Sequence, residues 1–340
     1  MRTESRESRA IAWEHGVLTV ESLGGMLGPT LFVLPDGRQV APLQVAPWAH
    51  EAGGNDLPGV LKRLRGEWPC VPFGVDADRP AQGAWPASQA AGTVDPGPHG
   101  FSSNNEWTIG AVDAAGVAMS IAYPEAHPIA SLQRRVMPDP ERAAIDFELT
   151  INVRSDCQLP IGLHPCFRLP HRAGAMRIEV DGGVAGATLP GEIDGDALFA
   201  RDQYAPRWNE IRLRDGGVLD VSGVPLAQRA EDLVQLLDMP GHGALWNTVE
   251  GYRVRLSWNK EHYPSALLWF SNRGRQQAPW NGRHLALGLE PICAAFDLGP
   301  QISTSPNPIS ARGIPTFRSF TAGERFITRY RIEVEPAEIL

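Results

Sequence analysis

The chain has 340 residues, of which 43% are hydrophobic and 21% charged, so it can build a sizeable core and is not disordered throughout. Gly (35) and Pro (30) make up about a fifth of the chain, a density that disfavours helical bundles, coiled coils and collagen-like structures. The formal net charge of −8 and the lack of a long Lys/Arg block argue against a nucleic-acid-binding protein.

The first half of the chain predicts short strands joined by tight turns. Apolar runs at residues 17–20, 31–34 and 117–121 are bounded by turn residues, which is typical of strands buried on both faces. Residues 76–100 are rich in Ala, Pro and Gly and predict a long loop inside one domain. Apolar side chains alternate with Asp, Glu and Thr over residues 145–151, which predicts an antiparallel strand with one solvated face.

The second half continues the same pattern. Alternation over residues 252–258 and 330–334 predicts two more half-buried strands. Apolar runs at residues 266–270 and 285–289 predict strands buried on both faces.

One segment differs from the rest in its spacing. Residues 226–237 carry a helical rhythm of apolar side chains, with a strand over residues 233–237 as the alternative. Because strands elsewhere do not alternate with helical patterns, the expected fold class is all-β, a large antiparallel β-sandwich with few short helices. We expect a single domain over residues 11–335, preceded by a polar N-terminal segment of residues 1–10.

The sequence also bounds the cellular context. No apolar run approaches the ~18 residues of a membrane span, and the polar start MRTESRESRA lacks the apolar stretch of a signal peptide. We therefore expect a cytoplasmic protein with no membrane or nucleic-acid partner, and the oligomeric state stays open. The four cysteines, which show no CxxC spacing, are expected to be reduced thiols: Cys70, Cys157, Cys166 and Cys293.

No metal or nucleotide cofactor is expected. The Cys and His residues have no zinc-like spacing, and the chain contains no P-loop, HExxH, EF-hand or GxSxG motif. Candidate chemistry is therefore sought in single side chains with unusual surroundings.

Glu290 is the first such side chain. It lies in LALGLEPICAAF, and burying an ionised carboxylate costs several kcal/mol unless it is paired or hydrogen-bonded. Either it ends a strand and faces solvent or an arginine, or it lies at the floor of a cleft that tunes its proton affinity.

His164, in PIGLHPCFRLP, is the second candidate. Histidine suits proton transfer near neutral pH, although a lone histidine among apolar residues is often a core residue. Pro165 and Pro291 each follow a candidate, and a following proline favours extended backbone at the residue before it.

His99 is the third candidate, in GPHGFSSNNEW. Asn104, Asn105 and Trp107 follow it, and sugars are bound by this mixture of amide groups and aromatic faces. The alternative is an ordinary polar loop before a strand.

Three segments together resemble motifs of the galactose mutarotase-like superfamily, which contains the aldose 1-epimerases. They are GLHPCFRL, PHGFSSNNEW and LGLEPICAAF, and their order and wide separation also match. The resemblance implies a large antiparallel β-sandwich, which agrees with the strand pattern. It also implies an isomerase that interconverts the α and β anomers of a hexose or related sugar.

The resemblance implies roles for individual residues. Glu290 would be the general base that removes the anomeric hydroxyl proton, and His164 the general acid that protonates the ring oxygen. His99 and Trp107 would contribute to sugar binding, with Arg65 as the match for an early arginine. Asp232 is the preferred candidate for the family's substrate-binding aspartate, with Asp238 as the alternative.

The chain also departs from the family's pattern. Cys166 stands where an aromatic residue is frequent, and Ser102 and Ser103 stand where many members carry an arginine. A basic loop at residues 273–284 either grips an anionic sugar group or is simply solvated.

Two other functions stay open from the sequence. One is a carbohydrate-binding or sugar-sensing protein without catalysis on the same fold. The other is a glycoside hydrolase or lyase that uses a carboxylate pair such as Glu67 and Glu290, which would have to lie about 5–10 Å apart.

Overall fold

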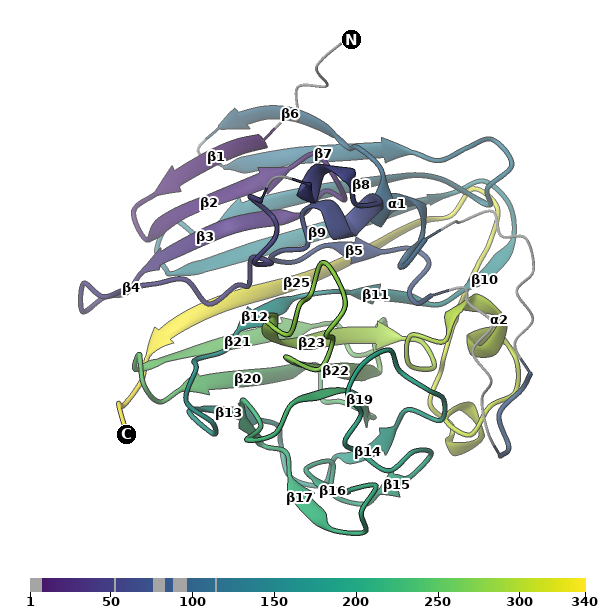
Figure 1. Cartoon of the computed structure of the whole chain (residues 1–340). Helices are drawn as coiled ribbons and strands as arrows, with labels where there is room; N and C mark the ends of the chain where they lie inside the picture. The colour runs from purple at the N-terminus through teal and green to yellow at the C-terminus, as the bar shows by residue number, and fades with distance from the viewer. Residues whose placement is uncertain (1–7, 52, 76–82, 88–96, 114) are drawn as a thin grey trace.

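The computed structural model describes residues 8–51, 53–75, 83–87, 97–113 and 115–340, and its named strands pair antiparallel throughout (Figure 1). The nine-stranded sheet has the order β18 (Gly223–Val224), β13 (Met176–Glu179), β20 (His242–Asn247), β21 (Tyr252–Trp258), β25 (Arg325–Pro336), β9 (Ala144–Val153), β8 (Ile129–Pro138), β7 (Gly116–Ala122) and β6 (Thr108–Asp113).

The eight-stranded sheet lies beside it and carries most of the residues discussed below. Its order is β15 (Tyr204–Ala205), β14 (Ala185–Thr188), β19 (Ala230–Leu237), β22 (Ser265–Asn272), β23 (Leu285–Cys293), β11 (Ile161–Leu163) and β5 (Pro69–Cys70), with β12 (Cys166–Arg168) also paired to β23.

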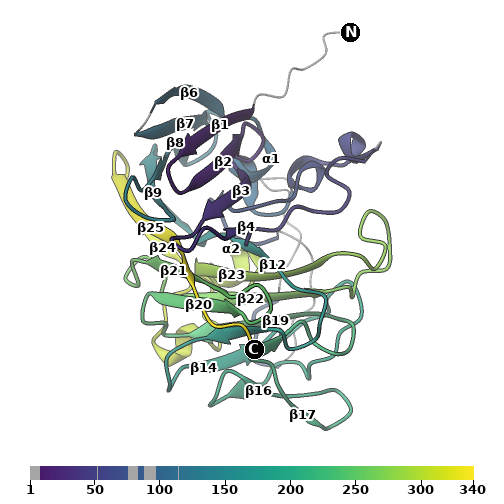
Figure 2. The same cartoon turned by 90° about the vertical axis from the view of Figure 1, so that its left-hand side faces the viewer.

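Smaller elements complete the fold, and Figure 2 shows them around the two large sheets. A four-stranded sheet contains β1 (Ser8–Trp13), β2 (Gly16–Glu21), β3 (Leu27–Val33) and β4 (Gln39–Val40). Two strand pairs join β10 (Cys157–Leu159) to β24 (Arg318–Phe320) and β16 (Glu210–Arg212) to β17 (Val218–Asp220). The α-helices of the described residues are α1 (Gly100–Asn104) and α2 (Gly299–Thr304), neither of which is long enough to span a membrane.

The all-β prediction is confirmed, and most predicted strands are present. β1 begins at Ser8, before the expected domain start, whereas residues 1–7 and most of the expected loop 76–100 lie outside the described residues. The runs predicted to be buried on both faces are so in β22 and β23, but β2 and β7 bury only alternate residues.

The helix at residues 226–237 is a wrong prediction, and its strand alternative is right. β19 occupies Ala230–Leu237 and every one of its residues is buried. A strand buried on both faces has no polar alternation, so its apolar residues fit a helical spacing equally well.

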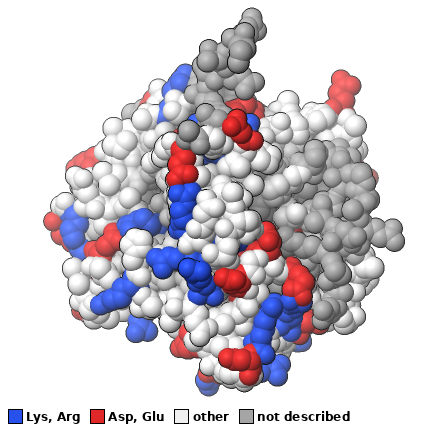
Figure 3. Space-filling model, in the orientation of Figure 1, with Lys and Arg blue, Asp and Glu red and all other residues white. Residues whose placement is uncertain are grey.

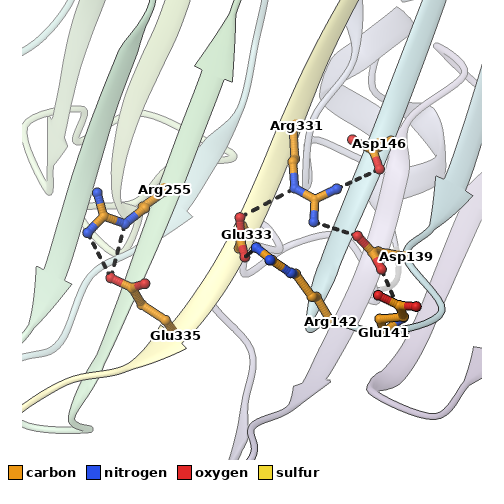
Figure 4. Close-up of polar contacts among 8 residues, drawn as sticks. All are labelled: Asp139, Glu141, Arg142, Asp146, Arg255, Arg331, Glu333 and Glu335. Atoms are coloured by element: carbon orange, nitrogen blue, oxygen red, sulfur yellow. Dashed lines mark hydrogen bonds and ion pairs between the residues drawn. The ribbon is translucent and has the colours of Figure 1, made fainter.

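The outer face of the nine-stranded sheet carries paired charges, as the alternating sequence predicts. Arg331 of β25 contacts Asp146 and Asp139, each at 2.6 Å, and Glu333 at 3.4 Å (Figure 4). On the face drawn in Figure 3, acidic and basic side chains are likewise interspersed.

Two apolar clusters lie on opposite faces of the eight-stranded sheet. The larger one fills the space between the sheets and includes Phe147, Val234 and Leu289. The smaller one covers the other face and includes Leu233, Leu267 and several tryptophans. The sheet therefore has one face in the main core and one face that contributes to a separate, aromatic-rich site.

Candidate active site

A cavity of about 370 Å³ lies over this second face of the eight-stranded sheet. Trp68, Trp269 and Trp280 contribute aromatic rings to its lining, together with aliphatic side chains such as Leu233 and Leu267. Its titratable lining residues are His99, His164, Asp194, Arg275, Glu290 and Asp297. Aromatic faces beside a few polar groups are the surroundings that a sugar ring needs.

The strand register brings His164 and Glu290 together. β11 and β12 both pair with β23, through Gly162 opposite Ile292 and Cys166 opposite Gly288. Residues 164 and 290 lie opposite each other between these pairs, and on the same face because side chains alternate along a strand. His164 Nδ1 is 3.5 Å from Glu290 Oε1, so two residues far apart in the sequence form one site.

The Glu290 carboxyl group is buried and only partly satisfied. Its side chain is 2% exposed, and Oε1 has no hydrogen-bond partner among the described residues. Gly288 makes room for it, because a Cβ there would come within 2.1 Å of Oε1. Burial raises the pKa of Glu290 well above its usual value, and the charge of Asp297 raises it further.

The His164 imidazole is held from several sides. Its ring stacks on Trp68 at 4.1 Å, and its backbone N–H donates to the Trp68 carbonyl at 2.9 Å. Nδ1 also lies 3.4 Å from Cys166 Sγ. Burial lowers the pKa of His164 well below its usual value, and the nearby His99 lowers it further.

These two pKa directions favour the uncharged form of both groups. Burial disfavours the carboxylate and the imidazolium, which favours a proton on Glu290 beside a neutral His164. At 3.5 Å the two groups are close enough to exchange this proton through a small rearrangement or a bound hydroxyl. The pair can therefore supply an acid and a base to one substrate.

His99 lies beside this pair and directly precedes the first residue of α1. Its ring meets the His164 ring edge-on at 4.7 Å and packs on Phe73 at 4.9 Å. The Gly74 N–H donates to His99 Nδ1 at 3.4 Å, which assigns the proton of the neutral ring to Nε2. All three candidates that anchored the sequence motifs thus line the same cavity.

The remaining predicted binding residues do not line the cavity. Arg65 donates to the Arg63 carbonyl and to Glu21, and its side chain is buried. Trp107 belongs to the main core, where its indole N–H donates to the Ser102 carbonyl.

Asp232 lies on the main-core face of β19, where its Oδ2 accepts hydrogen bonds from the Leu198 and Phe199 N–H groups. Burial raises its pKa to about 7, against the effect of these hydrogen bonds. Asp238 follows β19 and lines a different pocket.

Sequence reasoning missed several other residues that line the cavity. Trp68, Asp194 and Asp297 belong to none of the three sequence motifs. The sequence also did not indicate which residues of the basic loop at 273–284 would lie in a binding site. In the structure, Arg275 and Trp280 of that loop line the cavity, whereas Arg283 pairs outside it with Glu51. Side chains alternate between the two faces of β19, so Glu231 lies on the cavity side of the sheet and Asp232 faces the main core.

The carboxylate pair of the hydrolase hypothesis is not formed around the cavity. Glu67 is fully buried, accepts from Tyr330 at 2.7 Å and pairs with Arg134. Glu67 does not line the cavity, so Glu67 and Glu290 cannot flank a sugar bound there.

Comparison with known proteins supports the fold. No protein-family model matches the chain, and no curated protein matches its sequence. Among solved structures, an Escherichia coli K12 protein described as a candidate aldose 1-epimerase superposes with a TM-score of 0.64 at 14% identity, covering 98% of this chain and 100% of its own.

Two further structures agree. A galactose mutarotase related enzyme from Lactobacillus acidophilus gives a TM-score of 0.59 at 10% identity, with 98% of each chain covered. A galactose mutarotase-like protein from Clostridium acetobutylicum gives 0.58 at 12% identity, covering 97% of this chain and 96% of its own. The chain therefore has the galactose mutarotase-like fold, as the three sequence motifs predicted.

Proposed function

We propose that the protein is an aldose 1-epimerase-type isomerase that interconverts the α and β anomers of a hexose or related sugar. The observation that carries this proposal is the buried Oε1 of Glu290, which has no hydrogen-bond partner among the described residues and lies 3.5 Å from His164 Nδ1. A sugar hydroxyl bound there would give this oxygen its missing donor.

Ring opening needs one base and one acid. The anomeric hydroxyl donates to Glu290, and this hydrogen bond favours the carboxylate, so the shared proton passes to His164. Glu290 then takes the anomeric proton, the O1–H electrons form the C1=O bond, and the C1–O5 bond breaks as His164 protonates O5. The pair ends in its resting state, with the proton on Glu290.

Reclosure reverses these transfers after rotation about the C1–C2 bond. His164 removes the O5 proton while O5 attacks either face of the aldehyde, and Glu290 returns a proton to O1. Every step moves protons between oxygen and nitrogen atoms of the sugar and this pair. His99, with its proton on Nε2, would donate to a ring or hydroxyl oxygen nearby.

The alternative is a sugar-binding protein without catalysis, favoured by the three tryptophans of the cavity. Polarimetry of freshly dissolved α-aldoses separates the two, with calorimetric binding measured in parallel. We expect the approach to equilibrium to accelerate in proportion to protein concentration, and Glu290→Gln to bind sugar without acceleration. Binding by the wild type with no acceleration for any aldose would establish the alternative instead.

A further inference from the structure

Arg275 lines the cavity and is held there by contacts with neighbouring residues. Its guanidinium lies 4.5 Å from the Trp280 ring and 5.7 Å from the Trp269 ring. Nε donates to the Asp194 carbonyl at 3.2 Å, and Nη2 lies 3.2 Å from Glu231 Oε1. The hydrogen bonds and ion pairs of Arg275 with described residues use Nε and Nη2 and not Nη1, and Arg275 is one of the residues that line the cavity.

Glu231 holds both Arg275 and Trp269 in position. It is fully buried, and its two oxygens accept from the Trp269 indole N–H at 2.5 Å and from the Ser271 hydroxyl at 3.3 Å. Ser271 is in turn 2.8 Å from His284 Nδ1, and the His284 ring stacks on Trp269. One carboxylate therefore fixes both an aromatic wall of the cavity and its arginine.

The charges around Arg275 indicate what it would bind. Buried Glu231, whose pKa burial raises to about 7, pairs with the guanidinium, and the carboxyl side chains of Asp194 and Asp297 line the same cavity. A phosphate or carboxylate group on the sugar would meet repulsion from them. A neutral diol suits the site better, because its hydroxyls accept from the guanidinium and donate to Asp194.

We propose that Arg275 is a specificity-determining residue that donates hydrogen bonds to hydroxyls of an uncharged sugar, and that Glu231 is its positioning residue. This inference rests on the proposed function and adds the class of substrate. Arg275 binds the sugar, Trp269 and Trp280 pack on its C–H faces, and Glu290 and His164 carry out the proton transfers.

The test uses the whole protein and a panel of D-glucose, D-galactose, D-xylose, L-arabinose, D-glucose 6-phosphate and D-glucuronate. The probe is the uncharged aldose with the highest kcat/KM or, if none is turned over, the one bound most tightly in calorimetry. Arg275→Met should raise KM, or Kd, by about 10-fold or more while kcat changes less than about 3-fold, since one charged hydrogen-bond donor is lost.

Glu231→Gln separates positioning from mere structural support. The amide keeps an acceptor for Trp269 but leaves the Arg275 charge uncompensated. We expect weaker binding of the uncharged probe and an increased preference for D-glucose 6-phosphate over D-glucose, by about 5-fold or more, which a purely structural role would not produce. Arg283→Met is the matched control, because Arg283 lies on the same loop and pairs with Glu51 outside the cavity.

Three outcomes would overturn the inference. They are unchanged KM and Kd in Arg275→Met, a wild type that binds D-glucose 6-phosphate more tightly than every uncharged aldose, and a wild type that binds no uncharged aldose. Failure of the proposed function gives a different result. If the protein is not an epimerase, no aldose is turned over, but the dependence of the sugar Kd on Arg275 can still be measured in the wild type and in Glu290→Gln.

Discussion

Burial decides the protonation of the two side chains that meet at the floor of the cavity. An isolated carboxyl group and an isolated imidazole in the same apolar surroundings each adopt the uncharged form, and their pKa values move in opposite directions. The result is a pair that holds one proton and can pass it on. The sequence predicted these two residues because each stands in a recognisable motif before a proline.

Replacing either member of the pair should remove catalysis while keeping the fold. We expect Glu290→Gln and His164→Ala to lower the rate of anomer exchange by about 10²–10⁴-fold, the contribution typical of a positioned acid or base. Thermal unfolding of both variants provides the control, since a loss of activity with a collapsed transition would indicate misfolding. Activity near that of the wild type in Glu290→Gln would contradict the proposed mechanism.

The residue scale also explains why Asp232, a predicted binding residue, is not among the residues that line the cavity. A change of one position along a strand moves a side chain to the other face of the sheet, so Glu231 and Asp232 have different environments. The residue types of β19 alone did not indicate which of its two faces lies toward the cavity. The register with β22, where Leu233 pairs with Trp269, supplies that information.

Asp232 should instead affect the pH dependence of stability. Its folded-state pKa of about 7 lies above the usual value of 3.8, so its stabilising contribution is complete below about pH 4 and is lost as the pH rises through 7. In Asp232→Asn this loss is absent. The free energy of unfolding is measured in urea at pH 4.5 and pH 8. Relative to the wild type, the free energy of unfolding of the variant should be higher at pH 8 than at pH 4.5, by on the order of 2 kcal/mol. An equal difference at both pH values would show that Asp232 does not titrate in this range.

At the scale of single elements, β23 does most to build the site. It pairs with β22, β11 and β12, and it brings Trp269, Gly288 and Cys166 into one row across the sheet. Its apolar sequence predicted a strand, and that prediction is confirmed. What the sequence did not show is that the glycine two residues before Glu290 opens the space for its carboxyl group.

Gly288→Ala tests this element directly. The new methyl group would meet Glu290 Oε1 at 2.1 Å and Trp269 Cβ at 3.0 Å, so the carboxyl group must move. We expect kcat to fall by at least about 10-fold, because small displacements of a catalytic group are costly. Gly243→Ala in β20 is the control, since its Cβ would make an ordinary 3.4 Å contact with Leu289. Equal activity in both variants would argue against the role of Gly288.

At the scale of the whole molecule, a buried ion pair ties the site to the nine-stranded sheet. Glu67 pairs with Arg134 of β8 and accepts from Tyr330 of β25, and the next residue, Trp68, stacks on His164. Phe147 lies against both Arg134 and Tyr330. Period-two patterning predicted the strands, but the pairing of a loop carboxylate with an arginine 67 positions later depends on the packing of the sheets.

Removing one partner of this pair should destabilise the fold strongly. Glu67→Leu leaves the Arg134 charge buried without its partner, at an expected cost of about 3–5 kcal/mol in the free energy of unfolding. Arg329→Met, next to Tyr330 on β25, breaks a pair in which the arginine is largely exposed and should cost less than about 1 kcal/mol. Urea unfolding of both variants measures the contrast, and comparable losses would contradict it.

The most direct test of the account is anomer exchange measured by NMR. Exchange spectroscopy on the C1 protons of equilibrated α- and β-aldoses reports turnover without any coupled reaction. Wild-type protein should produce exchange cross-peaks between the two anomers of at least one uncharged aldose, and Glu290→Gln at the same concentration should not. Exchange no faster than in buffer for every aldose, with a correctly folded wild type, would contradict the assignment of Glu290 and His164 as a proton-transferring pair.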